Sequence, residues 1–266
     1  MQRELAKDYM NLGVYISAYE LLLEVQLYED CILCLFLGGR ATQAEQLASE
    51  QLSKQNVPPG ILCLLGDIKK DHTYYIKAWE VSKQKFARAM RSLGRYYFFQ
   101  QDYKKAIECY ERALSINRLY ADSWFTLGCA YMRSADWKNA IYSFGTSISI
   151  DDQNAEGWCN IASCYMQQDK SKEAIVCLEQ ALKQKRKSWQ IWENYIILCL
   201  DTRQFHKSVN AARELIRLDM IERVNVNLML KICDVFLKNY VSSSQQKKAE
   251  SQDESSGESE YHVSKR

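Results

Sequence analysis

The stretch ADSWFTLGCAYMRSADWKNAIYSFGTSISIDDQN, residues 121–154, decides the fold because its key positions recur at a constant interval. Trp124, Trp158 and Trp192 stand 34 residues apart. Further apolar or small residues keep the same interval: Leu93, Leu127 and Ile161; Gly94, Gly128 and Ala162; Tyr97, Tyr131 and Tyr165; Ala106, Ala140, Ala174 and Ser208; Tyr110, Phe144, Leu178 and Ala212. Six positions in phase over four units indicate an internal repeat rather than a chance match.

Each unit has the pattern of two amphipathic helices. The first helix carries residues at i, i+3, i+4 and i+7: Trp124, Leu127, Gly128 and Tyr131. A second stripe consists of Ala140, Phe144 and Ser147. The small residues predict places where two helices approach closely, and the large rings fill the wider spaces. Because one hairpin cannot bury this surface alone, the units are expected to stack.

The period and the residue types resemble the tetratricopeptide repeat (TPR) family, whose unit is a helical hairpin of 34 residues. The resemblance implies an all-α protein, a right-handed α-solenoid of stacked TPR helical hairpins. It places four TPR units at residues 87–120, 121–154, 155–188 and 189–222. The fourth unit departs most, with Tyr195, Ile196 and Cys199 where the others have Leu, Gly and Tyr. No proline closes these units, so other residues must end the hairpins.

The remaining sequence has less regular patterns. Residues 1–86 are predicted to form degenerate helical, TPR-like repeats, with helices at residues 3–12, 15–25, 29–37, 41–54, 61–68 and 73–82. Residues 223–241 are predicted to form a terminal helix, either a cap of the array or the first helix of a further hairpin. Residues 242–266 are rich in Ser and Glu and are expected to be disordered. Ser251 and Ser255 each precede a Glu by three residues, which fits acid-directed phosphorylation, but a plain solvated tail is favoured.

The composition fits a helical protein without a strong electrostatic target. The chain of 266 residues is 47% hydrophobic and contains two prolines. Its net charge of +2 gives no overall attraction to nucleic acid or anionic membranes. No uncharged apolar run of about 18 residues occurs, so no membrane span is predicted. The opening residues, MQRELAKDYM, lack the apolar core of a signal peptide, which favours the cytoplasm and also the nucleus.

No group of residues predicts catalysis or metal binding. The ten cysteines fall mostly inside helical stripes and are interpreted as small buried hydrophobic residues. Cys31-x-x-Cys34 is the one pair with a redox or metal spacing, but no second Cys or His pair stands at zinc-finger spacing. His72 and His206 fall in predicted turns, where they are expected to be solvated. Without a phosphate loop or a catalytic motif, we predict no enzymatic activity, no cofactor and no metal.

The TPR resemblance also implies a binding surface, because the first helix of each hairpin lines the concave groove of a TPR array. In TPR units, positions 2, 5, 9, 12 and 13 usually point into that groove. The candidate partner-binding residues at these positions are Arg88, Arg91, Arg95, Phe98, Phe125 and Met132. The arginines form one charged stripe suited to an acidic peptide or a carboxylate. A solvated helix face is the alternative interpretation of the same residues.

We therefore predict a non-enzymatic scaffold that binds protein or peptide partners, with acidic segments favoured. The carboxylate clamp by which some TPR domains bind chaperone tails is not reproduced in either register of these units. The segments YEDCILCLFLGGRATQAEQL (28–47) and LGDIKKDHTYYIKAWEVSKQKFARAMRSLGRYYF (65–98) resemble longer eukaryotic TPR proteins. That resemblance implies an intracellular adaptor in chaperone-assisted complex assembly. The alternatives are a structural subunit that packs through its convex face or ends, and RNA binding, which the absence of a continuous basic stripe disfavours.

Overall fold

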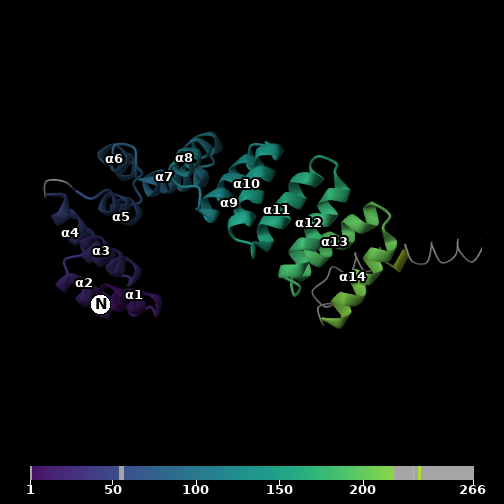
Figure 1. Ribbon diagram of the computed structural model, residues 1–266, viewed down its shortest axis with the longest axis horizontal. Helices are drawn as coiled ribbons and strands as arrows, with labels where there is room; N and C mark the ends of the chain where they lie inside the picture. The colour runs from purple at the N-terminus through teal and green to yellow at the C-terminus, as the bar shows by residue number, and fades with distance from the viewer. Residues whose placement is uncertain (1, 54–56, 219–229, 231–232, 235–266) are drawn as a thin grey trace, which may run out of the picture. The chain divides into compact units, whose positions relative to one another are not determined.

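The computed structural model describes residues 2–53, 57–218, 230 and 233–234. Every regular element in this part of the chain is a helix. The chain forms two compact units, residues 1–152 and 153–266. Within each unit the helices follow one another as hairpins (Figure 1). The predicted all-α fold of successive helical hairpins is confirmed.

The helices of the first unit are α1 (Gln2–Asn11), α2 (Tyr15–Glu24), α3 (Tyr28–Leu37), α4 (Ala41–Leu52), α5 (Pro59–Lys69), α6 (Thr73–Val81), α7 (Ala87–Phe99), α8 (Tyr103–Ile116), α9 (Ala121–Arg133) and α10 (Trp137–Ile150). Those described in the second unit are α11 (Ala155–Met166), α12 (Ser171–Gln184), α13 (Trp189–Asp201) and α14 (Phe205–Arg217). Each odd-numbered helix packs against the even-numbered helix that follows it. In addition, α8 packs against α9, and α12 packs against α13.

The helices predicted for residues 1–86 are all present, with ends that differ by a few residues. The largest difference is at α5, which begins at Pro59. A proline fits the first turn of a helix because its missing N–H costs no intrahelical hydrogen bond there. Of the predicted terminal helix, only residues 230 and 233–234 are described, and they are helical. The tail predicted to be disordered lies outside the described residues.

The turns of the four hairpins from α7 to α14 share one backbone motif. Gln101, Ala135, Asp169 and Arg203, again 34 residues apart, have φ angles of +61°, +58°, +57° and +57°. In the first of these turns the Asp102 N–H donates to the Tyr97 carbonyl at 3.0 Å. This hydrogen bond closes a Schellman motif, which satisfies a carbonyl at the end of the first helix. Residues other than glycine or proline therefore end these helices.

Inside the hairpins, glycines of the first helix face aromatic rings of the second. A Cβ atom on Gly94 would lie 3.0 Å from the Tyr110 ring, and one on Gly128 would lie 2.8 Å from the Phe144 ring. Phe144 is completely buried, so its ring has little room to shift. The sequence predicts that two helices approach closely at the small residues, and this is confirmed at Gly94 and Gly128.

The hydrophobic core of the first unit continues from one hairpin to the next. One cluster joins α1, α2 and α3, another joins α3, α4 and α5, and a third joins α5, α6, α7 and α8. A fourth cluster links α8 to α9. Because neighbouring clusters share helices, each hairpin of this unit depends on its neighbour to bury its apolar face, as expected for stacked repeats.

Replacing Gly128 with alanine is expected to destabilise the protein by about 1–3 kcal/mol, because the added methyl group overpacks against Phe144. Gly145 in α10 is a matched control, since a Cβ atom there meets nothing within 4 Å. Gly145→Ala should stabilise the helix by about 0.5–1 kcal/mol through its intrinsic propensity. Thermal and urea unfolding followed by circular dichroism would compare the variants, and an unchanged midpoint for Gly128→Ala would contradict the close packing.

Candidate functional site

The predicted partner-binding residues lie on the first helices of two successive hairpins. The arginines and Phe98 belong to α7, whereas Phe125 and Met132 belong to α9. The two sets occupy equivalent positions of their units, so each set lies along one face of its helix. The contacts of the individual side chains nevertheless differ, and they decide which residues remain available to a partner.

Arg88 is engaged within the chain. Its Nη1 atom lies 3.1 Å from Glu29 Oε1 of α3, and its Nη2 atom lies 3.8 Å from Asp67 Oδ2 of α5. The Tyr75 hydroxyl donates to the other Asp67 oxygen at 2.8 Å. A Cβ atom on Gly60 would lie 2.1 Å from the Glu29 carboxylate, so the end of the Glu29 side chain lies directly against α5. Arg88 therefore ties the first helices α3, α5 and α7 together.

Burial dominates the electrostatics of this network. It raises the pKa of the Glu29 carboxyl, and the nearby Arg88 guanidinium partly offsets that effect by lowering the same pKa. Arg88 and Glu29 keep side-chain exposures of 34% and 42%, so solvent screens their attraction. The Arg88–Glu29 ion pair is therefore a half-buried contact between α7 and α3.

Arg91, Arg95 and Phe98 make other contacts, and Arg95 is the most exposed of them. The Arg91 guanidinium carbon lies 4.2 Å from the centroid of the Tyr120 ring, a cation–π contact with an uncharged group. Arg95 is exposed, and Phe98 is half-buried. The Phe98 ring packs edge-on at 6.3 Å from Phe99, whose side chain is 76% exposed. Cationic and aromatic groups thus lie close together on α7.

Phe125 and Met132 continue this surface on α9. Both are half-buried, and the Phe125 ring lies 5.4 Å from the buried Phe144 ring. Phe125 therefore contributes to the core of its hairpin as well as to the surface. We use the term first-helix surface for Arg91, Arg95, Phe98, Phe125 and Met132.

The structure also tests the predictions made for the histidines and for the Cys31–Cys34 pair. His72 was expected to be solvated, but it is half-buried and stacks on the Tyr96 ring at 4.5 Å, because the turn before α6 lies against α7. His206 is exposed. Cys31 and Cys34 are completely buried, and burial raises the pKa of both thiols to about 11, so they stay protonated at neutral pH.

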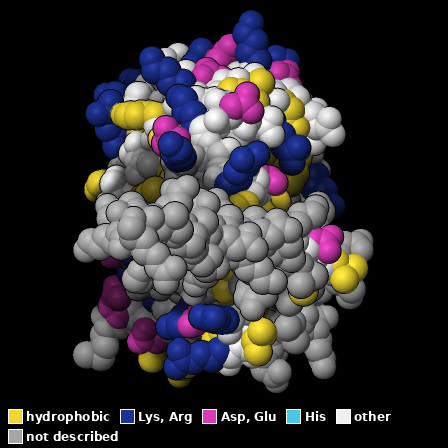
Figure 2. Space-filling model, turned by 90° about the vertical axis from the view of Figure 1, so that its right-hand side faces the viewer, with side chains coloured by type: hydrophobic (Ala, Val, Ile, Leu, Met, Phe, Trp, Pro, Cys, Tyr) yellow, Lys and Arg dark blue, Asp and Glu magenta, His cyan; other side chains and the backbone are white. Residues whose placement is uncertain are grey.

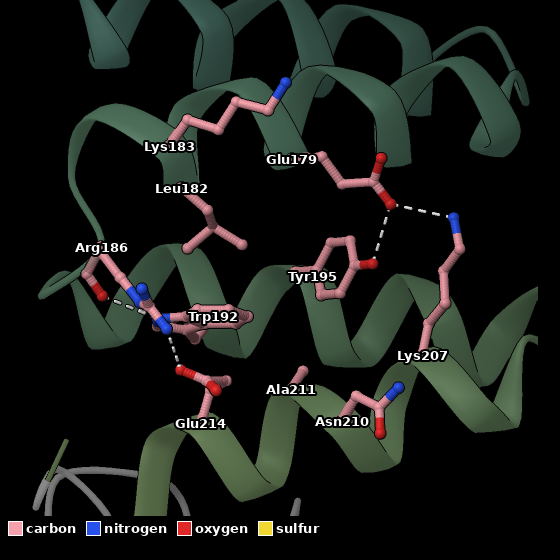
Figure 3. Close-up of a pocket in the computed structure, with 10 residues that line it drawn as sticks. All are labelled: Glu179, Leu182, Lys183, Arg186, Trp192, Tyr195, Lys207, Asn210, Ala211 and Glu214. Atoms are coloured by element: carbon pink, nitrogen blue, oxygen red, sulfur yellow. Dashed lines mark hydrogen bonds and ion pairs between the residues drawn. The ribbon is translucent and has the colours of Figure 1, made fainter. Parts of the chain in front are cut away.

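A cavity that sequence analysis missed lies in the second unit. Its volume is about 380 Å³, and it is open to solvent and lined by the end of α12, by α13 and by α14 (Figure 3). We call it the α12–α14 cavity. Its lining residues are Glu179, Leu182, Lys183, Arg186, Trp192, Tyr195, Lys207, Asn210, Ala211 and Glu214.

Hydrogen bonds fix the polar walls of this cavity. The Trp192 indole N–H donates to the Arg186 carbonyl at 2.8 Å. Glu179 Oε1 accepts from the Tyr195 hydroxyl and from Lys207 Nζ, both at 2.9 Å (Figure 3). Burial and the hydrogen bond to Glu179 raise the pKa of Tyr195, so its hydroxyl remains a donor. The Arg186 guanidinium also pairs with Glu214 across the cavity.

An equivalent cavity occurs in the first unit, between α8, α9 and α10. It measures about 300 Å³, and we call it the α8–α10 cavity. Its lining residues are Glu111, Leu114, Ser115, Arg118, Trp124, Leu127, Tyr131, Asn139, Tyr142 and Ser143. The residue 68 positions after each of these lines the α12–α14 cavity, except that Tyr131 corresponds to Cys199. The Trp124 indole again donates to an arginine carbonyl, that of Arg118, at 2.8 Å. The cavity is thus a property of the repeat.

The charges facing solvent are mixed. Figure 2 shows Lys and Arg side chains next to Asp, Glu and hydrophobic side chains among the described residues of one face. Over the described residues, no helix is both long and apolar enough for a membrane crossing. The same part of the chain holds no group of three His, Cys, Asp or Glu side chains placed to bind a metal ion.

Family models match two parts of the repeat region. A model described as tetratricopeptide repeat covers residues 155–188, and one described as TPR repeat covers residues 94–134. These matches agree with the hairpins, the recurring turn and the 34-residue interval between equivalent positions. The chain is a tetratricopeptide repeat protein.

Its curated relatives are longer TPR proteins. The chain is 42% identical over 234 residues to the tetratricopeptide repeat protein 27 homolog of Dictyostelium discoideum. It is 31% identical over 247 residues to a TPR repeat-containing protein of Schizosaccharomyces pombe. Both matches cover 88% of this chain but only 27% and 30% of the relatives, so the chain spans less than a third of their length. The resemblance predicted from residues 28–47 and 65–98 is confirmed.

Solved structures support the fold. The C-terminal part of a TPR repeat-containing protein from Cytophaga hutchinsonii has a TM-score of 0.67 at 16% identity, covering 86% of this chain and 98% of that chain. YrrB, titled a TPR protein with an unusual peptide-binding site, has a TM-score of 0.55 at 18% identity, covering 66% of this chain and 92% of that chain. At these identities the likeness concerns the fold alone.

Arg88→Ala is expected to destabilise the protein by about 1 kcal/mol, because it removes the cation shared by Glu29 and Asp67. Loss of Arg88 raises the pKa of Glu29 further above its unfolded value, so the folded state binds that proton more tightly than the unfolded state. The loss of stability relative to wild type should therefore grow as the pH rises through the titration range of Glu29, and it should shrink in acid, where Glu29 is protonated. Urea unfolding at several pH values would measure it.

Arg95→Ala is the matched control for this experiment, since Arg95 is an exposed arginine of the same helix. It should change stability by less than about 0.5 kcal/mol at every pH. Equal effects of the two substitutions would show that the contacts of Arg88 with α3 and α5 do not stabilise the fold.

Proposed function

We propose that this chain is a non-enzymatic scaffold that binds acidic protein segments through the first-helix surface. TPR proteins bind peptides and proteins as a class, and this surface supplies both charge and apolar contact. The observation that carries the proposal is the placement of Arg91 and exposed Arg95 beside the half-buried Phe98 on α7. Arg88 is left out of the proposal because Glu29 and Asp67 already engage its guanidinium.

Two kinds of interaction would contribute to binding, namely charge-assisted hydrogen bonds and apolar contact. Guanidinium groups donate charge-assisted hydrogen bonds to carboxylates, which fixes the orientation of an acidic segment. Phe98, Phe125 and Met132 provide apolar and adaptable contact area beside these charges. Because the surface is built on packed helices, little conformational order is lost on binding. The resemblance to the longer TPR relatives extends this proposal to an adaptor in chaperone-assisted complex assembly.

A structural subunit is the second candidate, and a feature of the first hairpin favours it. Leu5 and Leu12 are seven residues apart, as are Ile16 and Leu23, and their side chains are 42%, 75%, 50% and 42% exposed. This spacing places Ile16 and Leu23 on one side of α2, whereas Leu5 lies on α1 and Leu12 in the turn that follows it. Such a face would suit packing against another helical hairpin, and concentration-dependent association relieved by one partner would support this candidate.

The proposed function is tested with Arg91→Glu combined with Arg95→Glu in the full chain. The double variant should weaken binding of a fluorescein-labelled, glutamate-rich peptide containing a phenylalanine by about tenfold or more, since two attractive charges become repulsive. The same variant should lose specific partners in affinity capture from cell extract. Fluorescence anisotropy and quantitative mass spectrometry would provide the two measurements, with circular dichroism to verify folding.

Lys104→Glu combined with Arg112→Glu is the matched control, because both residues are exposed on α8 and the change in net charge is the same. This control should retain binding. Equal losses in both double variants would show only a general effect of charge. Retained binding in both would exclude the first-helix surface and favour a structural role through other faces.

A further inference from the structure

We propose that the α12–α14 cavity is a second docking site, which takes a leucine or phenylalanine side chain from an acidic protein segment. The inference rests on the proposed scaffold function only in that both sites bind protein segments. Three features of the cavity carry it: its position on the helices, its apolar interior and its surplus of positive charge.

The cavity belongs to a different side of the hairpin from the first-helix surface. This is seen on α9, where Trp124, Leu127 and Tyr131 line the equivalent cavity and Phe125 and Met132 belong to the first-helix surface. At about 100° per residue, the two sets are centred roughly 120° apart around the helix. The cavity therefore opens between two second helices, and a ligand there need not contact the first-helix surface of that hairpin.

The interior of the cavity is suited to an apolar side chain. Leu182 and the Trp192 ring lie toward its centre, and Tyr195 and Ala211 continue the floor (Figure 3). Its volume of about 380 Å³ is at the lower end of the range for ligand pockets, about 300–1,000 Å³. That size accommodates one large side chain with part of its backbone. Because the indole and the phenol are held by hydrogen bonds, the cavity is formed before a ligand arrives.

The rim of the cavity favours an acidic segment. It carries three cationic side chains and two carboxylates, which gives a net charge of +1. Two of the cations are paired, Lys207 with Glu179 and Arg186 with Glu214. The third, Lys183, is exposed, and its Nζ atom donates to the uncharged Gln180 side chain at 3.1 Å. Lys183 is thus the cation most available to a ligand carboxylate.

The α8–α10 cavity lacks this preference, although its shape is equivalent. It is lined by one carboxylate, Glu111, and one cation, Arg118, so its net charge is zero. Ser115 stands at the position equivalent to Lys183, and Asn139 at that equivalent to Lys207. The chain therefore contains a neutral counterpart of the proposed site, and this counterpart supplies position-matched control variants.

The test uses the full chain and a short fluorescein-labelled peptide with a central leucine-phenylalanine pair flanked by aspartates and glutamates. In the background of Arg91→Glu combined with Arg95→Glu, where the first-helix surface no longer binds, Asn210→Trp fills the cavity from an exposed position on α14 and should weaken binding about tenfold or more. Lys183→Glu reverses the rim charge without altering the core and should weaken binding severalfold, with a smaller dependence on salt. A peptide in which alanines replace the central pair should lose the part of its binding that is sensitive to Asn210→Trp.

Position-matched controls introduce tryptophan and glutamate at the equivalent positions of the α8–α10 cavity, as Tyr142→Trp and Ser115→Glu. Both should stay within about twofold of wild type. Arg91→Glu combined with Arg95→Glu separates the two proposals: it removes binding at the first-helix surface, and the remaining binding should still be sensitive to Asn210→Trp. The inference is overturned if wild type does not bind the peptide, if Asn210→Trp and Lys183→Glu bind like wild type, or if the control variants lose as much. Thermal unfolding would verify that Asn210→Trp is folded, and Lys183→Glu carries the test alone if it is not.

Discussion

The close approach of the two helices within a hairpin is the constraint on which the rest of the structure depends. At Gly94 and Gly128 an added Cβ atom would collide with the ring on the facing helix. The two positions must therefore be complementary in size. In the fourth TPR unit, formed by α13 and α14, Ile196 takes the place of the glycine and Ala212 that of the ring, and both are buried. The large residue is therefore on the first helix and the small one on the second. The sum of volumes, rather than a particular residue, satisfies the constraint.

Much of this fold could be predicted from the interval between tryptophans, because a repeated sequence repeats its packing. The glycine and aromatic series indicated the helices and also which positions approach closely. The turns could not be predicted in the same way. Gln101, Ala135, Asp169 and Arg203 share a left-handed backbone conformation but no side-chain chemistry. Their conformation is imposed by the hydrogen bonds that close the preceding helix, and residue type does not reveal it.

The candidate site was predicted only at the level of helix faces. Helical spacing indicated that Arg88, Arg91 and Arg95 share a face, but it could not reveal that Arg88 contacts Glu29, which is 59 residues earlier. That contact depends on the stacking of three hairpins. The cavities could not be predicted from single helices because three helices line each of them. Their signal was present in the sequence as pairs 68 residues apart, such as Glu111 and Glu179.

The fourth TPR unit shows how the lining of the cavity can change while the packing of the helices is kept. Tyr131 donates to Glu111, but the equivalent of Tyr131 is Cys199, which cannot form that bond to Glu179. Tyr195, one helical turn earlier, donates to Glu179 instead. The wall of the cavity is thus kept by a different residue. The rim positions differ in residue type, since Ser115 becomes Lys183 and Asn139 becomes Lys207 between the two cavities. Charge at the rim can therefore change from repeat to repeat while the packing beneath it is preserved, and so a regular array can present sites with different ligand preferences.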